Sequence, residues 1–115
     1  MFEAFARREV EAALACMHPE IEFVPGGTNR VLGRSGSYHG HEGMRRYFAD
    51  VEAAWSELTI LPEDFRASAG GVVVFGSVDG LPRGAPPEQR ERNGAVWMWR
   101  LEGDLIRWGS VTPLP

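Results

Sequence analysis

Two stretches of the chain repeat their apolar residues at the spacing of an α-helix. In residues 2–17 the apolar side chains gather near one stripe, with the charged residues largely off it. This pattern predicts either one helix or two helices broken around Arg8. Residues 44–55 place apolar side chains at i, i+4, i+7 and i+11, which predicts a second helix with a narrow buried stripe. Gly40 is an acceptable N-cap, so this helix is expected to begin there.

Five shorter stretches show the apolar runs and the turn-bounded lengths of β-strands. They are residues 20–24, 58–67, 72–78, 94–101 and 105–112. Pro62 predicts an edge position or a bulge in the second of them, because proline cannot donate to the strand ladder. Residues 25–37 are rich in Gly, Ser, Asn and Thr and predict a loop. Residues 79–93 contain three prolines and several charges, and they predict a long mobile loop.

The order of these elements is helix, strand, helix and then four strands. Helices followed by antiparallel hairpins predict an α+β fold in which helices cover one face of a sheet. The length of 115 residues and the hydrophobic content of 43% suit a single domain with one core over residues 1–115.

Composition limits the binding partners and the cellular compartment that are expected for the protein. The net charge is −4, and a nucleic-acid partner is not expected because phosphate contacts need a basic face. No apolar run approaches the roughly 20 residues of a membrane span, and the N-terminus lacks the order of segments found in a signal peptide. The single Cys16 excludes an internal disulfide and fits a reducing compartment. The sequence therefore predicts a cytoplasmic protein without nucleic-acid or membrane partners.

Three segments, taken in their order and spacing, resemble one known family. They are FARREVEAALACMHPEIEFVP (5–25), YHGHEGMRRYF (38–48) and VWMWRLEGDLIRWGSV (96–111). Together they resemble the SnoaL-like branch of the nuclear transport factor 2-like superfamily. That superfamily also holds ketosteroid isomerases, limonene-epoxide hydrolases and polyketide cyclases.

The resemblance implies a cone-shaped roll of the cystatin-like kind. In it a curved antiparallel β-sheet wraps around N-terminal helices and leaves a mostly apolar pocket inside. It also implies a small apolar or aromatic ligand and a homodimer formed through the outer face of the sheet. No cofactor is predicted. Because one fold hosts many chemistries in this superfamily, the resemblance does not define a reaction.

The residues that carry the reaction in the resembling enzymes are absent here. Val24 stands before Pro25 where ketosteroid isomerases have a general-base aspartate. Met1 and Trp97 stand near the places of their oxyanion-hole tyrosine and acid. Gly109 stands near the acidic residue of the resembling polyketide cyclases. The chain is therefore predicted to be neither a standard isomerase nor a standard cyclase.

Two carboxylates are candidate acid–base groups. Glu22 shares a strand face with Val24, and the resemblance directs that face toward the pocket, where a carboxylate can act as general acid or base. The alternative is a Glu22 that is solvated at the rim or paired with an arginine. Asp64 follows the expected bend at Pro62 and either divides the acid and base roles with Glu22 or keeps an edge strand soluble.

His39 and His41 lie two residues apart at the start of the second helix. An extended segment would point both imidazoles the same way, and His18 or Glu22 would then complete a three-ligand metal site. A helix that begins at Gly40 makes the two imidazoles diverge, and no H-x-x-x-H or C-x-x-C spacing supports a metal. The sequence therefore predicts no metal site and keeps His39 as an acid–base candidate at the rim.

The last two strands carry Trp97, Trp99 and Trp108, the candidate wall of the pocket. A four-residue loop in their hairpin would place Trp99 opposite Trp108. Trp97 would then face Ser110 on the same side. A three-residue loop would instead move Trp108 to the other face, opposite Met98. The resemblance favours the first arrangement.

Indoles on one side of the sheet offer flat apolar walls with N–H donors, which suit a cyclic or aromatic ligand. The alternative is that they only fill the core beneath the helices. Val24, Phe48 and Ser110 complete the predicted ligand-facing set. Two functions are compatible with these residues. One is an isomerase, cyclase or hydrolase that uses a carboxylate on an apolar cyclic substrate; the other is a non-catalytic module for binding a hydrophobic ligand or for dimerisation.

Overall fold

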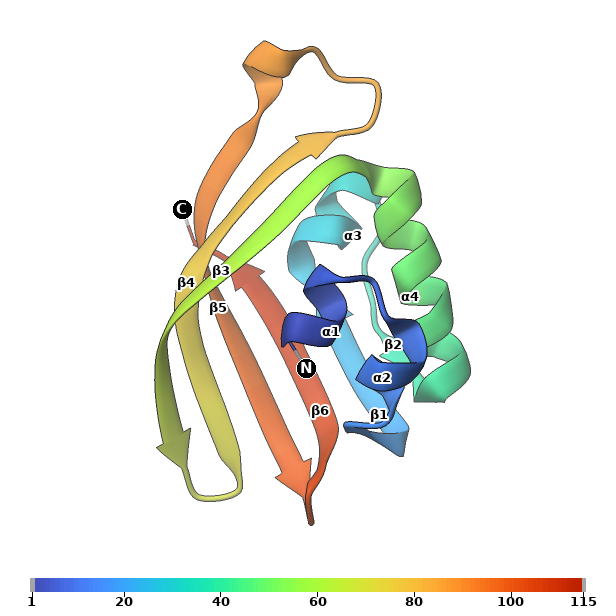
Figure 1. Ribbon diagram of the computed structural model, residues 1–115, viewed down its shortest axis with the longest axis vertical. Helices are drawn as coiled ribbons and strands as arrows, with labels where there is room; N and C mark the ends of the chain where they lie inside the picture. Colours follow the sequence, from blue (N-terminus) through green and yellow to red (C-terminus); the bar gives the residue numbers. More distant parts are fainter. Residues whose placement is uncertain (1, 115) are drawn as a thin grey trace.

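Six strands form one curved sheet, and the helices pack against one of its faces (Figure 1). The computed structural model describes residues 2–114, so Met1 lies outside the described residues. The strands are β1 (Met17–Pro25), β2 (Tyr38–His39), β3 (Trp55–Ser68), β4 (Gly71–Pro82), β5 (Glu91–Glu102) and β6 (Leu105–Pro113). Their order across the sheet is β2-β1-β6-β5-β4-β3. The predicted α+β fold with a curved sheet is confirmed.

The sheet is mixed. Neighbouring strands are antiparallel except β1 and β6, which run parallel, so the prediction of a wholly antiparallel sheet is wrong at this pair. A parallel pair needs a long crossover connection, and residues 26–104 supply it. β3 lies at the edge, and its register shifts between Pro62 and Asp64. Pro62 therefore has both features predicted for it, an edge strand and a bulge.

The N-terminal segment forms two short helices, α1 (Phe2–Ala6) and α2 (Val10–Leu14). Arg8 separates them with a backbone φ of 56°, in the left-handed region that non-glycine residues seldom adopt. Its guanidinium donates to the Leu58 carbonyl at 3.2 Å, which ties the break to β3. Of the two arrangements that the sequence leaves open, the structure has the broken one.

The long helix α4 (Gly40–Ala54) begins at the predicted residue. Gly40 has a φ of 69°, a conformation that glycine adopts without strain. The predicted stripe is buried: Met44 and Val51 are 0% and 1% exposed. α4 thus presents one apolar face to the sheet. Within residues 2–114, every helix is too short or too polar to cross a membrane.

The structure differs from the sequence-based expectation in the segment 25–37, where α3 (Gly26–Leu32) forms instead of a loop. Glycine, threonine and asparagine are weak helix formers, so tertiary contacts must hold this helix. Thr28 and Asn29 are buried, and the Asn29 side chain donates to the Gly36 carbonyl at 3.0 Å. Sequence periodicity could not reveal these contacts.

The predicted loop 79–93 is shorter than expected, because β4 and β5 extend into it from both sides. Residues 83–90 remain between the strands and include the 3-10 turn η1 (Pro87–Gln89). The Arg83 guanidinium donates to the carbonyls of Glu52 at 2.7 Å and Trp55 at 3.1 Å. These bonds satisfy carbonyls at the C-terminal end of α4 and anchor the loop there.

Candidate ligand pocket

Strand alternation gives the sheet two different faces. On β5, Trp97 is 1% exposed and Trp99 is 8% exposed, whereas Met98 between them is 41% exposed. On β1, Phe23 is buried on the same side as the two tryptophans, and its ring stacks on Trp99 with centroids 5.8 Å apart. The inner face is therefore the one beneath the helices.

A cavity lies between this inner face and the helices α3 and α4. Its volume is about 60 Å³, several times the space that one buried water needs. Its apolar lining includes Tyr47, Trp55, Leu58, Ile60, Val78, Ala95, Trp97 and Val111. Gly80 also lines it, and a Cβ there would lie 2.6 Å from Cζ3 of Trp55. Only glycine at this position lets the indole lie against β4.

Three polar side chains lie in the cavity wall. Trp55 Nε1 donates to Thr28 Oγ1 at 3.3 Å. An indole N–H is a donor only, so Thr28 is the acceptor in this bond. The Tyr47 phenol lines the same cavity and can donate its hydroxyl hydrogen to a group there.

Tyr47 is held firmly in this position. Its ring centroid lies 5.0 Å from that of Phe23 and 5.3 Å from that of Tyr38, both in edge-to-face contact. Burial raises the pKa of the Tyr47 phenol above its ordinary value, and the positive charge of Arg8 offsets only part of that effect. Tyr47 is thus a neutral hydrogen-bond donor at physiological pH.

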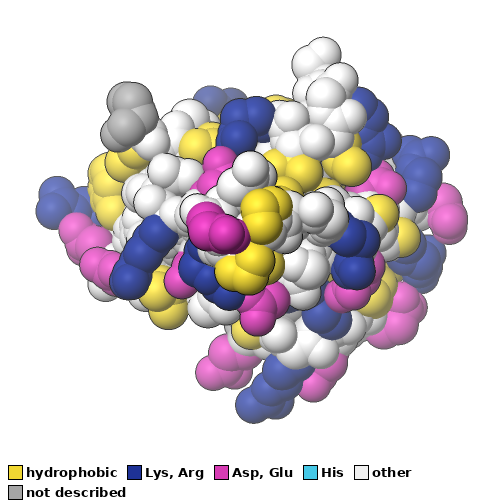
Figure 2. All heavy atoms as spheres, turned by 90° about the horizontal axis from the view of Figure 1, so that it is seen from above, with side chains coloured by type: hydrophobic (Ala, Val, Ile, Leu, Met, Phe, Trp, Pro, Cys, Tyr) yellow, Lys and Arg dark blue, Asp and Glu magenta, His cyan; other side chains and the backbone are white. Residues whose placement is uncertain are grey.

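The mouth of the cavity carries an ion pair between α3 and β5. Arg30 Nη2 lies 3.1 Å from Oε1 and 3.2 Å from Oε2 of Glu91. Both residues also line an open surface cleft together with Val31, Pro82 and Gln89. Figure 2 views this end of the molecule and shows arginine and acidic side chains interspersed around small groups of hydrophobic ones.

Glu22 and Val24 lie on the outer face of β1, so their predicted orientation toward the pocket is wrong. The buried neighbours are Phe23 and Pro25, and Pro25 is the β1 residue on the cavity lining. The resemblance placed Val24 at an inward position, but the strand alternates in the opposite sense. A difference of one residue in register moves every side chain to the other face.

The position of Trp108 is also opposite to the one favoured from the sequence. Leu101 does pair with Ile106, as the four-residue loop requires, but Arg100 pairs with Trp108. Arg107 is therefore an extra residue on β6, a bulge that reverses the alternation beyond it. Trp108 lies on the outer face, with the Arg100 guanidinium 5.2 Å from its ring centroid.

The same bulge decides which residues of β6 face inward. Ser110 pairs with Val24 and Met98 on the outer side, so its predicted ligand-facing position is wrong as well. Gly109 pairs with Trp99, and a Cβ there would lie 2.5 Å from the Trp99 ring. The glycine leaves room for the indole to lie flat on β6.

Trp97, Trp99 and Phe48 do face inward, with different surroundings. Trp97 lines the main cavity, and Trp99 lines a second cavity of about 20 Å³ beside it, together with Phe5. Phe48 is 4% exposed and packs in the core, with its ring centroid 5.4 Å from that of Phe5. Two of the predicted tryptophans thus combine the alternatives of core packing and cavity wall.

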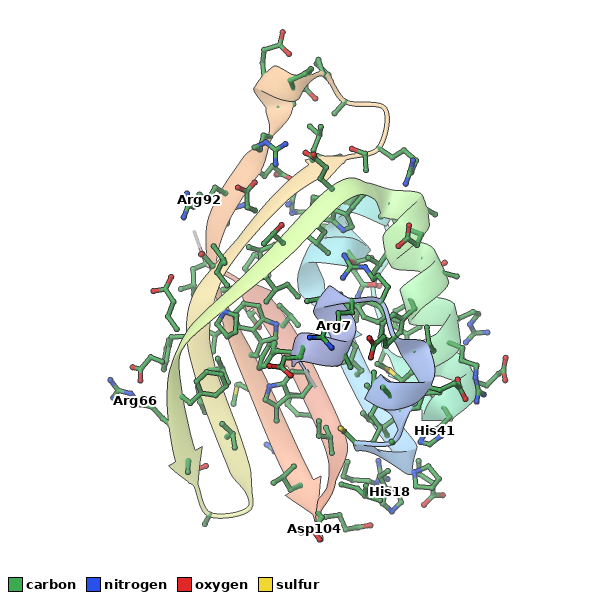
Figure 3. The ribbon with its side chains drawn as sticks, in the orientation of Figure 1. Arg7, His18, His41, Arg66, Arg92 and Asp104 are labelled. Carbon is green, nitrogen blue, oxygen red and sulfur yellow. The ribbon has the colours of Figure 1, made fainter. Side chains whose placement is uncertain are left out.

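The remaining candidate groups lie away from the cavity. Asp64 is exposed on β3 and pairs with Arg66 at 3.0 Å, and the His39 ring is exposed and bonded to Ser37. His41 bonds the Met17 carbonyl at 3.0 Å. Figure 3 shows His41 at the end of the molecule opposite the 83–90 loop, and Arg66 pointing away from the helices. No three metal-ligating side chains gather within residues 2–114.

The polar groups of the pocket were not among the site residues predicted from the sequence. Tyr47 precedes Phe48 on the apolar stripe and reads as core, and Thr28 and Arg30 lie in the segment expected to be a loop. Glu91 falls in the other expected loop. The only usable signal was the alternation of β5, which places Glu91 on the same face as Trp97 if the strand is extended to its true start.

Comparison with protein families gives a match to the SnoaL-like domain over residues 1–108. No curated protein sequence matches the chain. Among solved structures, an NTF2-like protein of unknown function from Burkholderia pseudomallei has a TM-score of 0.86 and 22% identity, over 98% of this chain and 84% of that one. TerC co-crystallised with polyporic acid has a TM-score of 0.82 and 23% identity, over 98% and 85%. A ketosteroid isomerase-like protein from Catenulispora acidiphila in complex with trimethylamine has a TM-score of 0.80 and 14% identity, over 96% and 79%.

Proposed function

Because the chain belongs to the SnoaL-like domain family, we propose that it binds a small apolar cyclic molecule in the cavity beneath α3 and α4. The observation that carries this proposal is the composition of the cavity wall. Indole and phenol rings and aliphatic side chains surround the space, and a few placed polar groups stand among them. This is the usual make-up of a small-molecule site.

The solved relatives are consistent with such a site. TerC was crystallised with polyporic acid and the Catenulispora protein with trimethylamine, so proteins of this fold accommodate small molecules of different chemistry. At these identities the likeness concerns the fold, and the ligand of this chain has to be found by experiment.

Turnover of the ligand is a second candidate function, and Glu91 is the observation that favours it. Glu91 is the one carboxylate among the described residues that line the cavity. A carboxylate at the mouth and a neutral phenol inside are groups that an isomerase, cyclase or hydrolase can use. The earlier candidates Glu22, Asp64 and His39 do not reach the cavity, so this second function rests on Glu91 and Tyr47.

A cavity-filling variant tests the binding proposal. Ala95→Leu places a bulky side chain inside the cavity, whereas Val96→Leu places the same side chain on the outer face of the same strand. Titration with 2-phenylethanol, followed by calorimetry, should give binding to the wild type and to Val96→Leu. Ala95→Leu should weaken it at least tenfold. Equal binding to all three proteins would contradict the proposal, and thermal unfolding checks that both variants are folded.

We also propose a homodimer formed through the outer face of the sheet. Val73, Phe75, Val96, Met98 and Trp108 share that face, and we call them the outer apolar patch. Phe75 and Met98 are each 41% exposed, which is unusual for a contiguous apolar group on a sheet. At its rim Asp64 and Arg66 pair with each other. A second copy of the chain would cover the patch.

A further inference from the structure

The Arg30–Glu91 pair lies between the apolar cavity and the open surface cleft. Both residues belong to the lining of each space, so a ligand that enters from the cleft meets both side chains. The Arg30 side chain is 53% exposed and the Glu91 side chain is 30% exposed. A half-exposed pair of this kind contributes little to stability, which leaves it available for exchange with a ligand.

Glu91 reaches the mouth from the start of β5, where it lies on the same face as Trp97. It pairs in register with Gly80, against which the Trp55 indole packs. Arg30 approaches from α3 on the other side of the opening, 61 residues away in sequence. The pair therefore joins the two walls of the mouth and not two neighbours on one element.

The interior of the cavity decides which charge a ligand should carry. The buried Tyr47 phenol lines the cavity and is neutral, so it can donate its hydroxyl hydrogen to an acceptor on a ligand. No carboxylate among residues 2–114 lines the cavity inside the mouth. A ligand ammonium group would find only Glu91, whereas an anion or a carbonyl oxygen finds donors both at the mouth and inside.

We propose that the ligand is a cyclic or aromatic acid whose anionic group replaces Glu91 as the partner of Arg30. This inference rests on the proposed function, since it specifies the ligand of the same cavity. The ring lies against Trp97 and Tyr47, and the carboxylate or acidic hydroxyl accepts from the Arg30 guanidinium. Glu91, released from Arg30, turns to water in the open cleft. Glu91 thus competes with the ligand anion for the Arg30 guanidinium.

Competition by Glu91 makes two substitutions act in opposite directions. Arg30→Gln removes the donor for the ligand anion and should weaken binding of an acid about tenfold. Glu91→Gln removes the competing carboxylate and should strengthen binding of the same acid about threefold. Arg92→Gln is the matched control, because Arg92 follows Glu91 on β5 and lies on the outer face.

Three probes with one ring and different charge test the inference: phenylacetate, 2-phenylethanol and 2-phenylethylammonium. Calorimetry on the full chain should show the acid binding most tightly and the ammonium most weakly. The acid should respond to the two mouth substitutions in opposite directions, and its affinity should fall with added salt. The neutral alcohol should bind wild type, Arg30→Gln, Glu91→Gln and Arg92→Gln alike.

The outcomes separate the two proposals. Binding of the alcohol with no preference for the acid, or an acid affinity unchanged in Arg30→Gln, would overturn the anionic ligand and leave the pocket intact. Tighter binding of the ammonium, lost in Glu91→Gln, would show a cationic ligand instead. Failure of all three probes to bind the wild type would refute the proposed function and this inference with it. Thermal unfolding of each variant shows whether a loss of binding reflects a loss of fold.

Discussion

The two faces of the sheet are built from similar apolar residues and meet opposite surroundings. On β5, Trp97 and Met98 are adjacent in sequence, yet their exposures are 1% and 41%. The helices cover the inner face and leave a cavity with placed polar groups. Nothing within residues 2–114 covers the outer face, where the apolar side chains lie among intrachain ion pairs.

Apolar character alone therefore does not identify a ligand site. The inner face encloses a cavity with a few polar groups among its apolar side chains, and these features suit a small molecule. The outer face has a row of apolar side chains across neighbouring strands, which suits a second protein surface. One strand serves both purposes because its side chains alternate.

Among substitutions that test the two faces, the largest expected effect comes from truncating the buried Trp97. Trp97→Ala should lower the free energy of unfolding by about 3–5 kcal/mol, because it opens a cavity in a packed core. Met98→Ala should change it by less than about 0.5 kcal/mol, as for other surface substitutions. Urea unfolding at a dilution where the chain is monomeric measures both. Similar losses in the two variants would contradict the assignment of faces.

Much of the fold could be predicted from the sequence because its signals were local. The stripe on α4, the start at Gly40 and the bulge at Pro62 follow from side-chain spacing and from the chemistry of glycine and proline. α3 could not be predicted, since buried contacts of Thr28 and Asn29 override its weak helix propensity. The parallel pairing of β1 and β6 could not be read from either strand alone.

The candidate site was harder to predict because its signals were not local. The face of Glu22 and the face of Trp108 each depend on a register, and one residue of difference reverses the result. In β6 that residue is Arg107, which is not marked as a bulge by any glycine or proline at its position. The inward positions of Trp97 and Trp99 were easier, because they lie on a regular strand two residues apart.

Disrupting the outer apolar patch should have the second largest effect, on the association of the dimer. Phe75→Glu places a charge in the middle of the outer apolar patch, and the dimer should weaken by at least about 2 kcal/mol, as at an interface hot spot. The unfolding free energy of the monomer should change little, since Phe75 is 41% exposed in the single chain. Sedimentation equilibrium over a range of concentrations measures the association.

Leu101→Glu is the control for this experiment. Leu101 is also 41% exposed but lies at the end of β5 beyond the patch, so its substitution should leave the dimer intact. A wild-type chain that stays monomeric at high concentration, or a dimer that responds equally to both substitutions, would contradict the proposed interface.

Alkaline pH should lower the free energy of unfolding, because both tyrosines of the chain are buried on the inner side of the sheet. Burial, together with hydrogen bonding to Asp50, raises the pKa of Tyr38 to about 12, while an unfolded phenol has a pKa of about 10. Between these values the unfolded chain loses a proton that the folded chain keeps. Stability from this source is complete below about pH 10 and falls by about 1.4 kcal/mol per pH unit up to about pH 12.

Tyr38→Phe should remove the contribution of Tyr38 to that slope. Urea unfolding at pH 8 to 12 measures it, with wild type and variant compared at each pH. Tyr47, whose pKa burial also raises, keeps part of the pH dependence in the variant. An identical slope in both proteins would show that Tyr38 ionises as readily in the folded chain as in the unfolded one.

The smallest effect should come from Trp108, and it tests the bulge at Arg107 directly. Trp108→Phe should cost about 0.5 kcal/mol or less, chiefly through a weaker contact with the Arg100 guanidinium. Of the four tryptophans only Trp108 is not buried, so acrylamide should quench its fluorescence selectively. In the monomeric Phe75→Glu background, Trp108→Phe should therefore remove the quenchable component and Trp97→Phe should leave it. If Trp108 were as protected as Trp97 in that background, the alternation beyond the bulge would be the reverse of the one observed, and Trp108 would belong to the pocket.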